Sequence, residues 1–320
     1  MAAEIAGAAA RLYDLPAGIG ARMINHSENA TYCLEAPDQR RWALRIHRQG
    51  YHTRAAIASE LDWVKAIRRD TAVSTPAPLP GRDGELVQNL PMPDGGLRHA
   101  VLFQWEDGCE PPDHDLSKTF AQLGAIAARL HLQARQYRRA PWFERLTWDF
   151  AGAFGPHAHW GQWRDGLGMD AALRPLFARA LEVMKRRLQR FGRGRERFGL
   201  AHCDMRLANL LIDGDAIKVI DFDDCGFSWF LYDCAAALSF FEHRADVPGL
   251  IAAWVEGYRK VADLPAEDAA EIPTFVLFRR LLLIAWIGSR KETALARSMG
   301  VAYTQSAAGL AEDYLSRFGN

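Results

Sequence analysis

The segment 202–223 constrains the fold of this 320-residue chain more than any other part of its sequence. Two apolar runs, 210–212 and 217–220, flank the turn-forming residues Asp-Gly-Asp. This pattern predicts a two-stranded hairpin that folds the chain back on itself. Because the hairpin starts directly after Asn209 and ends directly before Asp221, it is predicted to place these two side chains next to each other.

The polar residues around this hairpin are those that phosphoryl transfer requires. Asp204, five positions before Asn209, is predicted to be the catalytic base that accepts the hydrogen bond of an attacking hydroxyl group. Asn209, also a candidate catalytic residue, and Asp221 are predicted to bind Mg²⁺ on the phosphates of ATP. The alternative is an ordinary polar loop and hairpin, which two carboxylates and an amide in this register make the weaker interpretation.

Length and charge fit a globular enzyme of two lobes. Lys and Arg number 39 and Asp and Glu also number 39, so the formal charge is 39 − 39 = 0. Without a basic excess, the composition argues against nucleic acid and anionic membranes as partners. The five cysteines show no C-x-x-C spacing and predict free thiols in a reducing cytosol. The late apolar run 281–288 is shorter than the about 20 residues of a membrane helix, so a cytoplasmic protein is expected.

The first hundred residues predict a small antiparallel sheet of five strands with one helix. The clearest β-prone runs are 30–34, 42–46, 84–88 and 100–105. A polar turn at 25–29 can donate backbone N–H groups to phosphates, which makes Ser27, Asn29 and Thr31 candidate nucleotide-binding residues. Because the turn contains no glycine, an ordinary hairpin turn is the alternative interpretation.

Arg45 and Glu60 are predicted to form a buried ion pair. Thr53 is a plausible cap for a helix that runs to about Arg69, and Glu60 lies on its apolar face. A buried carboxylate requires a partner, and Arg45 on the preceding strand is the natural one. A guanidinium group also suits phosphate, so both residues are candidate nucleotide-binding residues. The alternative is a purely structural ion pair. The apolar face is marked by Ile57, Leu61, Val64 and Ile67.

The remainder of the chain is predicted to be mostly helical. Ser117 is predicted to cap a helix in which His131 is a hydrogen-bonded core residue rather than a catalyst. The aromatic residues of 141–163 favour packing over a substrate pocket. Four further helices are expected at 229–241, 248–260, 267–290 and 301–317.

Taken together, these motifs resemble the aminoglycoside phosphotransferase family. The resemblance rests on 27–32, 44–48, 59–61, 202–209, 220–224 and Tyr232-Asp233, and it spans about 21–283. The motifs are most similar to the branch of type II homoserine kinases and the bacterial stress-response serine/threonine kinase. The resemblance implies an α+β, bilobal, protein-kinase-like fold. Its lobes would be 1–105, a small antiparallel sheet with one helix, and 106–320, a larger and mostly helical lobe.

The resemblance also implies roles for residues that the pattern alone leaves open. Arg45 would take the place of the kinase lysine that pairs with a helix glutamate and orients phosphate. The backbone between Gln104 and Glu106 would bind the adenine edge of ATP. Asp233 would brace the catalytic loop through backbone N–H groups. Asp223 occupies the place of the protein-kinase glycine after Asp-Phe, and the resemblance assigns it no definite role.

The phosphate acceptor is less constrained than the chemistry. From Trp229 onward there are 11 acidic and 9 basic residues, a difference of two, so no cationic or anionic acceptor is demanded. A hydroxyl group of a small metabolite (an amino alcohol, sugar or aminoglycoside-like molecule) is the first expectation. A serine or threonine of a protein is the second, and a catalytically silent nucleotide-binding protein is the third. The sequence predicts no oligomeric state.

Overall fold

The computed structural model describes residues 2–26, 29–92 and 95–319. The chain forms two compact units that are each assembled from separate segments. Unit 1 comprises Met1–Cys109, Arg138–Arg145 and Leu211–Asp223, and unit 2 comprises Glu110–Tyr137, Leu146–Leu210 and Asp224–Asn320. The single lobe division between 105 and 106 stays a prediction, since each compact unit consists of three separate segments of the chain.

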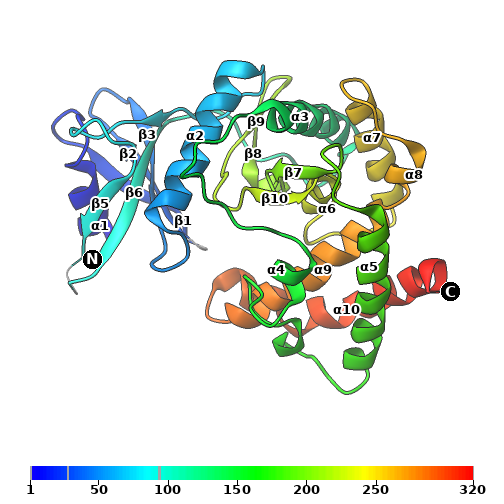
Figure 1. The fold of residues 1–320 in the computed structure, drawn as a ribbon. Coiled ribbons are helices and arrows are strands. Elements are labelled where there is room, and N and C mark those ends of the chain that lie inside the picture. The colour runs from blue at the N-terminus through cyan, green and yellow to red at the C-terminus, as the bar shows by residue number, and fades with distance from the viewer. Residues whose placement is uncertain (1, 27–28, 93–94, 320) are drawn as a thin grey trace. The chain divides into compact units, whose positions relative to one another are not determined.

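Unit 1 contains the predicted antiparallel sheet, with six strands among the described residues instead of the expected five (Figure 1). The strand order is β1-β2-β3-β6-β4, and β5 also pairs with β6. The bounds are β1 Gly20–His26, β2 Ala30–Glu35, β3 Arg41–Ile46, β4 Pro78–Leu79, β5 Gln88–Pro91 and β6 Leu97–Gln104.

One strand of this sheet was predicted in the wrong place. The run 84–88 is not a strand, because the Gly84 amide bonds back to the Gly81 carbonyl in a turn, and β5 begins only at Gln88. Pro78 and Leu79, in a proline-broken segment, pair with β6 at Phe103 and Leu102 and add the strand that the sequence did not predict.

Two helices cover opposite faces of the sheet (Figure 1). α1, Ala2–Ala10, was not predicted; its Ala6 and Ala9 pack with Leu44 on one face. α2, Arg54–Asp70, lies on the other face, where Ile57 packs with Val101. Because side chains alternate along a strand, the neighbours Leu44 and Arg45 point to different faces, and Arg45 points toward α2.

The predicted cap of α2 is confirmed and that of the next helix is wrong. The Thr53 hydroxyl accepts a hydrogen bond from the Ala56 amide at 3.0 Å and caps α2. In unit 2, α3 (Ser117–Gln136) already includes Ser117, and its N-cap is Leu116, which has no side chain able to make a cap bond.

Unit 2 is mostly helical, as predicted. After α3 come α4 Phe150–Phe154, α5 Leu173–Phe191, α6 Tyr232–Ala237, α7 Val247–Arg259, α8 Ala266–Ala269, α9 Ile272–Ser289 and α10 Ala294–Phe318. α3 and α7 approach closely through two glycines. A Cβ at Gly124 would lie 1.9 Å from the Trp254 carbonyl oxygen, and one at Gly257 would lie 1.8 Å from the Ala121 oxygen. Only glycine therefore fits at this helix crossing.

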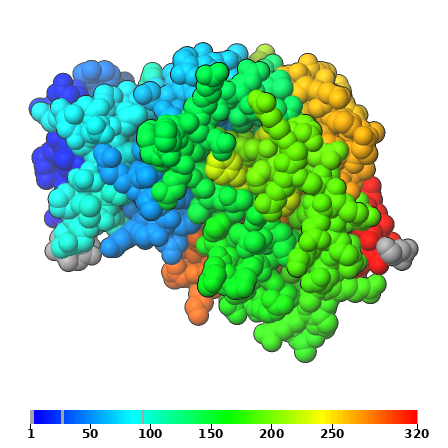
Figure 2. Space-filling model, in the orientation of Figure 1, coloured from blue at the N-terminus to red at the C-terminus, as the bar shows by residue number. Residues whose placement is uncertain are grey.

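The helix predicted at 229–241 is shorter: α6 runs only from Tyr232 to Ala237, and Trp229 is the last residue of a strand. β10, Gly226–Trp229, pairs antiparallel with β7, Phe198–Ala201. The helix expected at 301–317 is confirmed as the second part of α10, because Gly300, with φ 53° and ψ −149°, separates it from a first part that begins at Ala294. The C-terminal end of α10 lies at the molecular surface (red in Figure 2).

The apolar segment that contains α9 is longer than the run 281–288 noted in the sequence. The span Ala266–Ser289 is long and apolar enough to cross a membrane, and 83% of its most apolar window is buried within the protein. Burial of that degree is typical of a core helix, and α9 packs with α6, α10 and α5. Two arginines, Arg279 and Arg280, are nevertheless buried in it.

The predicted hairpin is confirmed. β8, Leu210–Asp213, pairs with β9, Ala216–Val219, and Gly214 in the turn has φ 61°. The interpretation of the aromatic segment as packing is confirmed for Trp148, Trp160 and Trp163, which are all buried. Trp148 and Trp160 meet edge to face, with ring centroids 4.9 Å apart.

Candidate active site

The loop that carries Asp204 is held by a buried carboxylate of α6. Asp233 accepts hydrogen bonds from the amides of His202 at 3.1 Å and Cys203 at 2.7 Å, which confirms the brace implied by the family resemblance. Cys203 has φ 65°, a backbone conformation that residues with a Cβ atom rarely adopt. The two bonds to Asp233 help to hold this strained loop in place.

His131 is the core residue that its position in the apolar helix predicted. It is fully buried, and its Nε2 lies 3.0 Å from Asp233 Oδ2 while its Nδ1 lies 3.2 Å from the Tyr258 hydroxyl. Burial opposes ionisation of Asp233, but the contact with His131 and the donated amide hydrogen bonds outweigh it and lower the pKa of that carboxyl. The brace on the loop is therefore a charged group.

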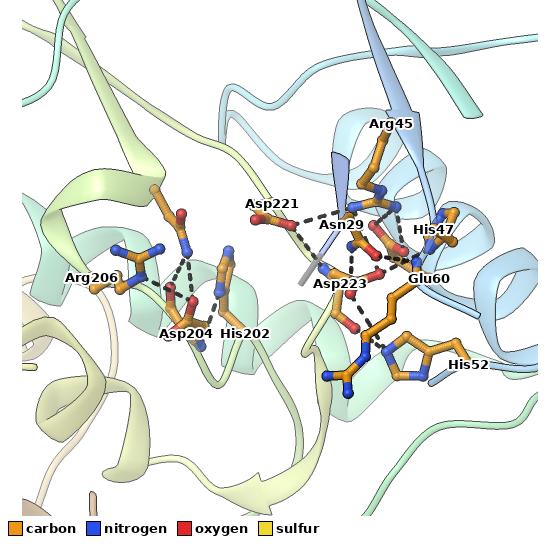
Figure 3. Close-up of polar contacts among 12 residues, drawn as sticks. Asn29, Arg45, His47, His52, Glu60, His202, Asp204, Arg206, Asp221 and Asp223 are labelled. Carbon is orange, nitrogen blue, oxygen red and sulfur yellow. Dashed lines mark hydrogen bonds and ion pairs between the residues drawn. The ribbon is translucent and has the colours of Figure 1, made fainter. Parts of the chain in front are cut away.

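The Asp204 carboxylate is surrounded by hydrogen-bond donors. Asn209 donates from Nδ2 to Asp204 Oδ2 at 2.7 Å and to the Asp204 carbonyl at 2.8 Å. Arg206 donates from Nε to the same Oδ2 at 3.3 Å, as Figure 3 shows. A guanidinium NH2 group of Arg279 donates to Oδ1. These contacts fix the carboxylate in one orientation at the end of the loop.

Arg279 is a residue of this site that the sequence motifs did not indicate. It lies in α9, 75 residues after Asp204, and nothing in the local pattern links the two. The available signal was an Arg-Arg pair inside an otherwise apolar helix, since a buried charge in such a helix requires a partner.

In unit 1, the predicted ion pair between Arg45 and Glu60 is confirmed. Arg45 NH2 lies 2.7 Å from both Glu60 carboxylate oxygens, and both side chains are buried. Arg45 NH1 also reaches Asp221 Oδ1 at 3.3 Å (Figure 3). Burial lowers the pKa of Arg45, but the charges of Glu60, Asp223 and Asp221 overcome this and raise it. The arginine is therefore a permanent cation beside Asp221.

Asp223, which had no definite role in the sequence reading, is the centre of a buried network in unit 1. Its Oδ2 accepts from Asn29 Nδ2 at 2.7 Å, and His47 Nδ1 lies 3.3 Å from its Oδ1. His52 donates to its carbonyl oxygen at 2.8 Å, and Arg145 donates to the same oxygen. Burial opposes ionisation, but His47, Arg45 and His52 lower the pKa of Asp223. Asp223 thus links the end of the hairpin to residues that lie directly before β2, directly after β3 and just before α2.

The other predicted nucleotide-binding residues have mixed environments. Asn29 is committed to Asp223 and accepts from the Arg48 amide at 2.9 Å. Thr31 lies opposite Arg45 in the β2–β3 ladder. Ser27 lies outside the described residues. Their contact with a nucleotide stays a prediction.

The predicted adenine-binding segment is partly committed to unit 1. The Gln104 amide donates to the Ala77 carbonyl at 2.8 Å, so that group is already used within the sheet. The Glu106 carboxylate lies 3.2 Å from Lys218 Nζ. Adenine binding by this backbone stays a prediction, with the groups after Gln104 as its candidates.

The chemistry of the available donors fits a hard divalent cation. Because Asn209 uses its amide nitrogen on Asp204, its amide oxygen is the atom left for a ligand. The Asp221 side chain is 43% exposed, so its carboxylate is accessible. Oxygen ligands of this kind suit Mg²⁺, which keeps waters and substrate phosphates in its remaining positions. Within the described residues, no group of three or more His, Cys, Asp or Glu side chains could hold a metal alone.

We expect Arg45→Ala to destabilise the protein and to weaken nucleotide binding. The substitution leaves the buried Glu60 without its partner, which should cost about 1–3 kcal/mol of unfolding free energy. Urea unfolding and the Michaelis constant for ATP measure the two effects, and Arg45→Lys should retain substantial activity. Unchanged stability and an unchanged Michaelis constant in Glu60→Ala would contradict a functional ion pair.

Comparisons with known proteins bear on this site. A model of the phosphotransferase enzyme family matches residues 21–270. A microcompartment-associated aminopropanol kinase of known structure is 41% identical, with a TM-score of 0.92 over 99% of this chain and 98% of that one. Amicoumacin kinase of Bacillus subtilis (strain 168) is 23% identical over 82% of this chain and 78% of its own length. The amicoumacin kinase hAmiN, solved with AMP-PNP, Ca²⁺ and Ami, has the same fold, with 20% identity and a TM-score of 0.77 over 96% of this chain and 92% of that one.

Proposed function

Because this chain belongs to the phosphotransferase enzyme family and transfers a phosphoryl group to a hydroxyl group of a small molecule, we propose that it is an ATP- and Mg²⁺-dependent kinase of a short amino alcohol. The kinase-like α+β fold and the family resemblance, both predicted from the sequence, are confirmed. The nature of the acceptor and the roles of individual residues are proposals.

The observation that carries the acceptor class is the likeness to the aminopropanol kinase. It extends over 99% of this chain and 98% of that one at 41% identity, so both the catalytic loop and α9 fall within it. This supports a small acceptor with one hydroxyl and one amino group.

The proposed reaction uses Asp204 as the base. The acceptor oxygen forms a bond to the γ-phosphorus of ATP while the bond from that phosphorus to the β–γ bridging oxygen breaks, and ADP leaves. The proton of the acceptor hydroxyl passes to the Asp204 carboxylate. Because Asn209 and Arg279 fix this carboxylate, it needs no reorientation when the acceptor arrives.

The remaining proposed residues act on the nucleotide. Asn209 and Asp221 would hold Mg²⁺, which neutralises charge on the phosphate oxygens when it is bound. Arg45, fixed by both oxygens of Glu60, would orient the phosphates. The backbone after Gln104 would bind the adenine.

A screen of matched acceptors tests the proposal. We expect ATP-dependent ADP formation with 1-amino-2-propanol, and a much lower kcat/KM with 1,2-propanediol, in which a hydroxyl replaces the amino group. Recognition of a charged amine is worth about 1.5–3 kcal/mol, which corresponds to about 10–150-fold in kcat/KM.

The screen should also include ethanolamine, homoserine, an aminoglycoside and an unstructured serine-rich peptide, with Asp204→Asn as the blank. Equal kcat/KM for the amine and the diol would contradict amine recognition. Phosphorylation of the peptide in preference to all small acceptors would favour a protein kinase instead.

A further inference from the structure

Arg279 is buried beside the catalytic loop, and its Nε, NH1 and NH2 atoms all donate hydrogen bonds. Its side chain is only 1% exposed. Its Nε donates to Ser239 Oγ at 2.9 Å, and its NH1 donates to the Tyr232 hydroxyl at 3.0 Å and to the Cys203 carbonyl at 3.2 Å. Its NH2 donates to Asp204 Oδ1. One guanidinium group therefore connects α9 and α6 to Cys203 and Asp204 in the loop.

The two arginines that contact Asp204 differ in character. Arg206 reaches Oδ2 only through Nε, and its side chain is 20% exposed, so it can move when an acceptor approaches. Arg279 is enclosed, and its guanidinium carbon lies 5.3 Å from the centre of the buried Trp160 ring. A planar guanidinium held by four acceptors and an aromatic ring has little freedom to move.

We propose that Arg279 is a positioning residue for phosphoryl transfer, which holds the Asp204 carboxylate in the orientation that accepts the acceptor proton. It acts through Asp204 and touches neither ATP nor the acceptor. Asp233 fixes the amide side of the strained Cys203 residue, and Arg279 fixes its carbonyl side together with the neighbouring carboxylate. The loop is thus clamped from two helices, one clamp anionic and the other cationic.

A positioning role gives a functional reason for the buried charge of Arg279 in α9. Stability alone does not require this charge, since replacing both partners of a buried ion pair by well-packed apolar residues often costs no stability. Orientation of a catalytic group is more demanding, because displacement of a reacting group by about 1 Å can lower a rate by about 10²-fold.

The test compares Arg279 with its neighbour Arg280. Arg280 is equally buried and pairs with Glu242 at 2.7 Å, but it makes no contact with the loop 202–209 among the described residues. We expect Arg279→Met to lower kcat by about 10²-fold, with the Michaelis constant for ATP within about twofold of wild type. Arg279→Lys keeps the charge but not the forked guanidinium group, so its kcat should lie between that of wild type and that of Arg279→Met. Arg280→Met should lower the melting temperature and leave kcat per folded molecule unchanged.

Ser239→Ala is a milder test of the same role, to be used if the Arg279 variants fail to fold. It removes the acceptor of Arg279 Nε and leaves the guanidinium in place, so kcat should fall severalfold with an unchanged Michaelis constant for ATP. Wild-type kcat in Ser239→Ala and in every folded Arg279 variant would overturn the proposal, as would an equal loss of kcat in Arg280→Met.

The inference rests on the proposed role of Asp204, and the two can fail separately. If Asp204→Asn turns over at the wild-type rate, the proposed base is wrong whatever the Arg279 variants do. If Asp204→Asn is inactive while folded Arg279 variants keep full kcat, only the positioning role is wrong. In the background of Asp204→Asn, Arg279→Met should cause little further loss, because a positioning residue has nothing left to position.

Discussion

Asp204→Asn should reduce kcat by about 10²–10⁴-fold, the usual contribution of a general base, while the affinity for Mg-ATP stays close to that of wild type. The variant keeps the shape of the side chain and removes the atom that takes the proton. Its amide can still accept one of the hydrogen bonds that Arg279 and Asn209 now donate. Steady-state kinetics with the identified acceptor and calorimetric titration with Mg-ATP measure the two quantities.

Asp246→Asn is a suitable control for this substitution. Asp246 also pairs with an arginine, Arg244 at 2.6 Å, but both are partly exposed and the pair lies outside the loop 202–209. It should leave kcat unchanged. A variant Asp204→Asn that binds ATP far more weakly, yet reaches the wild-type rate at saturation, would make Asp204 a nucleotide ligand and refute its role as base.

Asp221→Ala should abolish Mg²⁺-dependent nucleotide binding and all turnover. The substitution removes the one charged protein ligand that the proposal gives to Mg²⁺, and it leaves Arg45 NH1 without its 3.3 Å contact. Calorimetric titration of Mg-ATP into the folded variant measures the loss.

A second substitution separates charge from backbone strain at this position. Asp221 has φ 60°, a conformation that asparagine tolerates better than alanine. Asp221→Asn should therefore fold as wild type does and still bind Mg-ATP weakly, because a neutral amide is a poorer Mg²⁺ ligand. Asp213→Ala at the end of β8 in the same hairpin should bind Mg-ATP normally. Undiminished affinity in either Asp221 variant would contradict the metal assignment.

Local periodicity was sufficient to predict much of the site. Glu60 was placed on the apolar face of α2 by spacings of three and four, and Arg45 on the same side by its position in a short strand. The confirmed contact at 2.7 Å follows from those two periods and from the requirement that a buried carboxylate be paired. The hairpin was predictable for a similar reason, since its turn residues and apolar runs are adjacent in sequence.

Long-range contacts could not be predicted in the same way. Asn29 and Asp223 are 194 residues apart, and Asp204 and Arg279 are 75 apart. Neither pair belongs to one repeating pattern, so only the folded chain shows which polar groups meet. The early start predicted for the helix at 229–241 has a related cause, because Trp229 belongs to β10 through its pairing with β7 and α6 begins only at Tyr232. Tertiary pairing overrode local preference there.

The central claim is that this chain phosphorylates the hydroxyl of a short amino alcohol, with Asp204 as the base. Phosphorus-31 NMR of ATP, Mg²⁺ and 1-amino-2-propanol with the wild-type protein tests it most directly. The account predicts a new phosphomonoester signal that grows in step with ADP, and no such signal with Asp204→Asn. Release of ADP with inorganic phosphate alone, or a phosphomonoester formed equally well by Asp204→Asn, would contradict it.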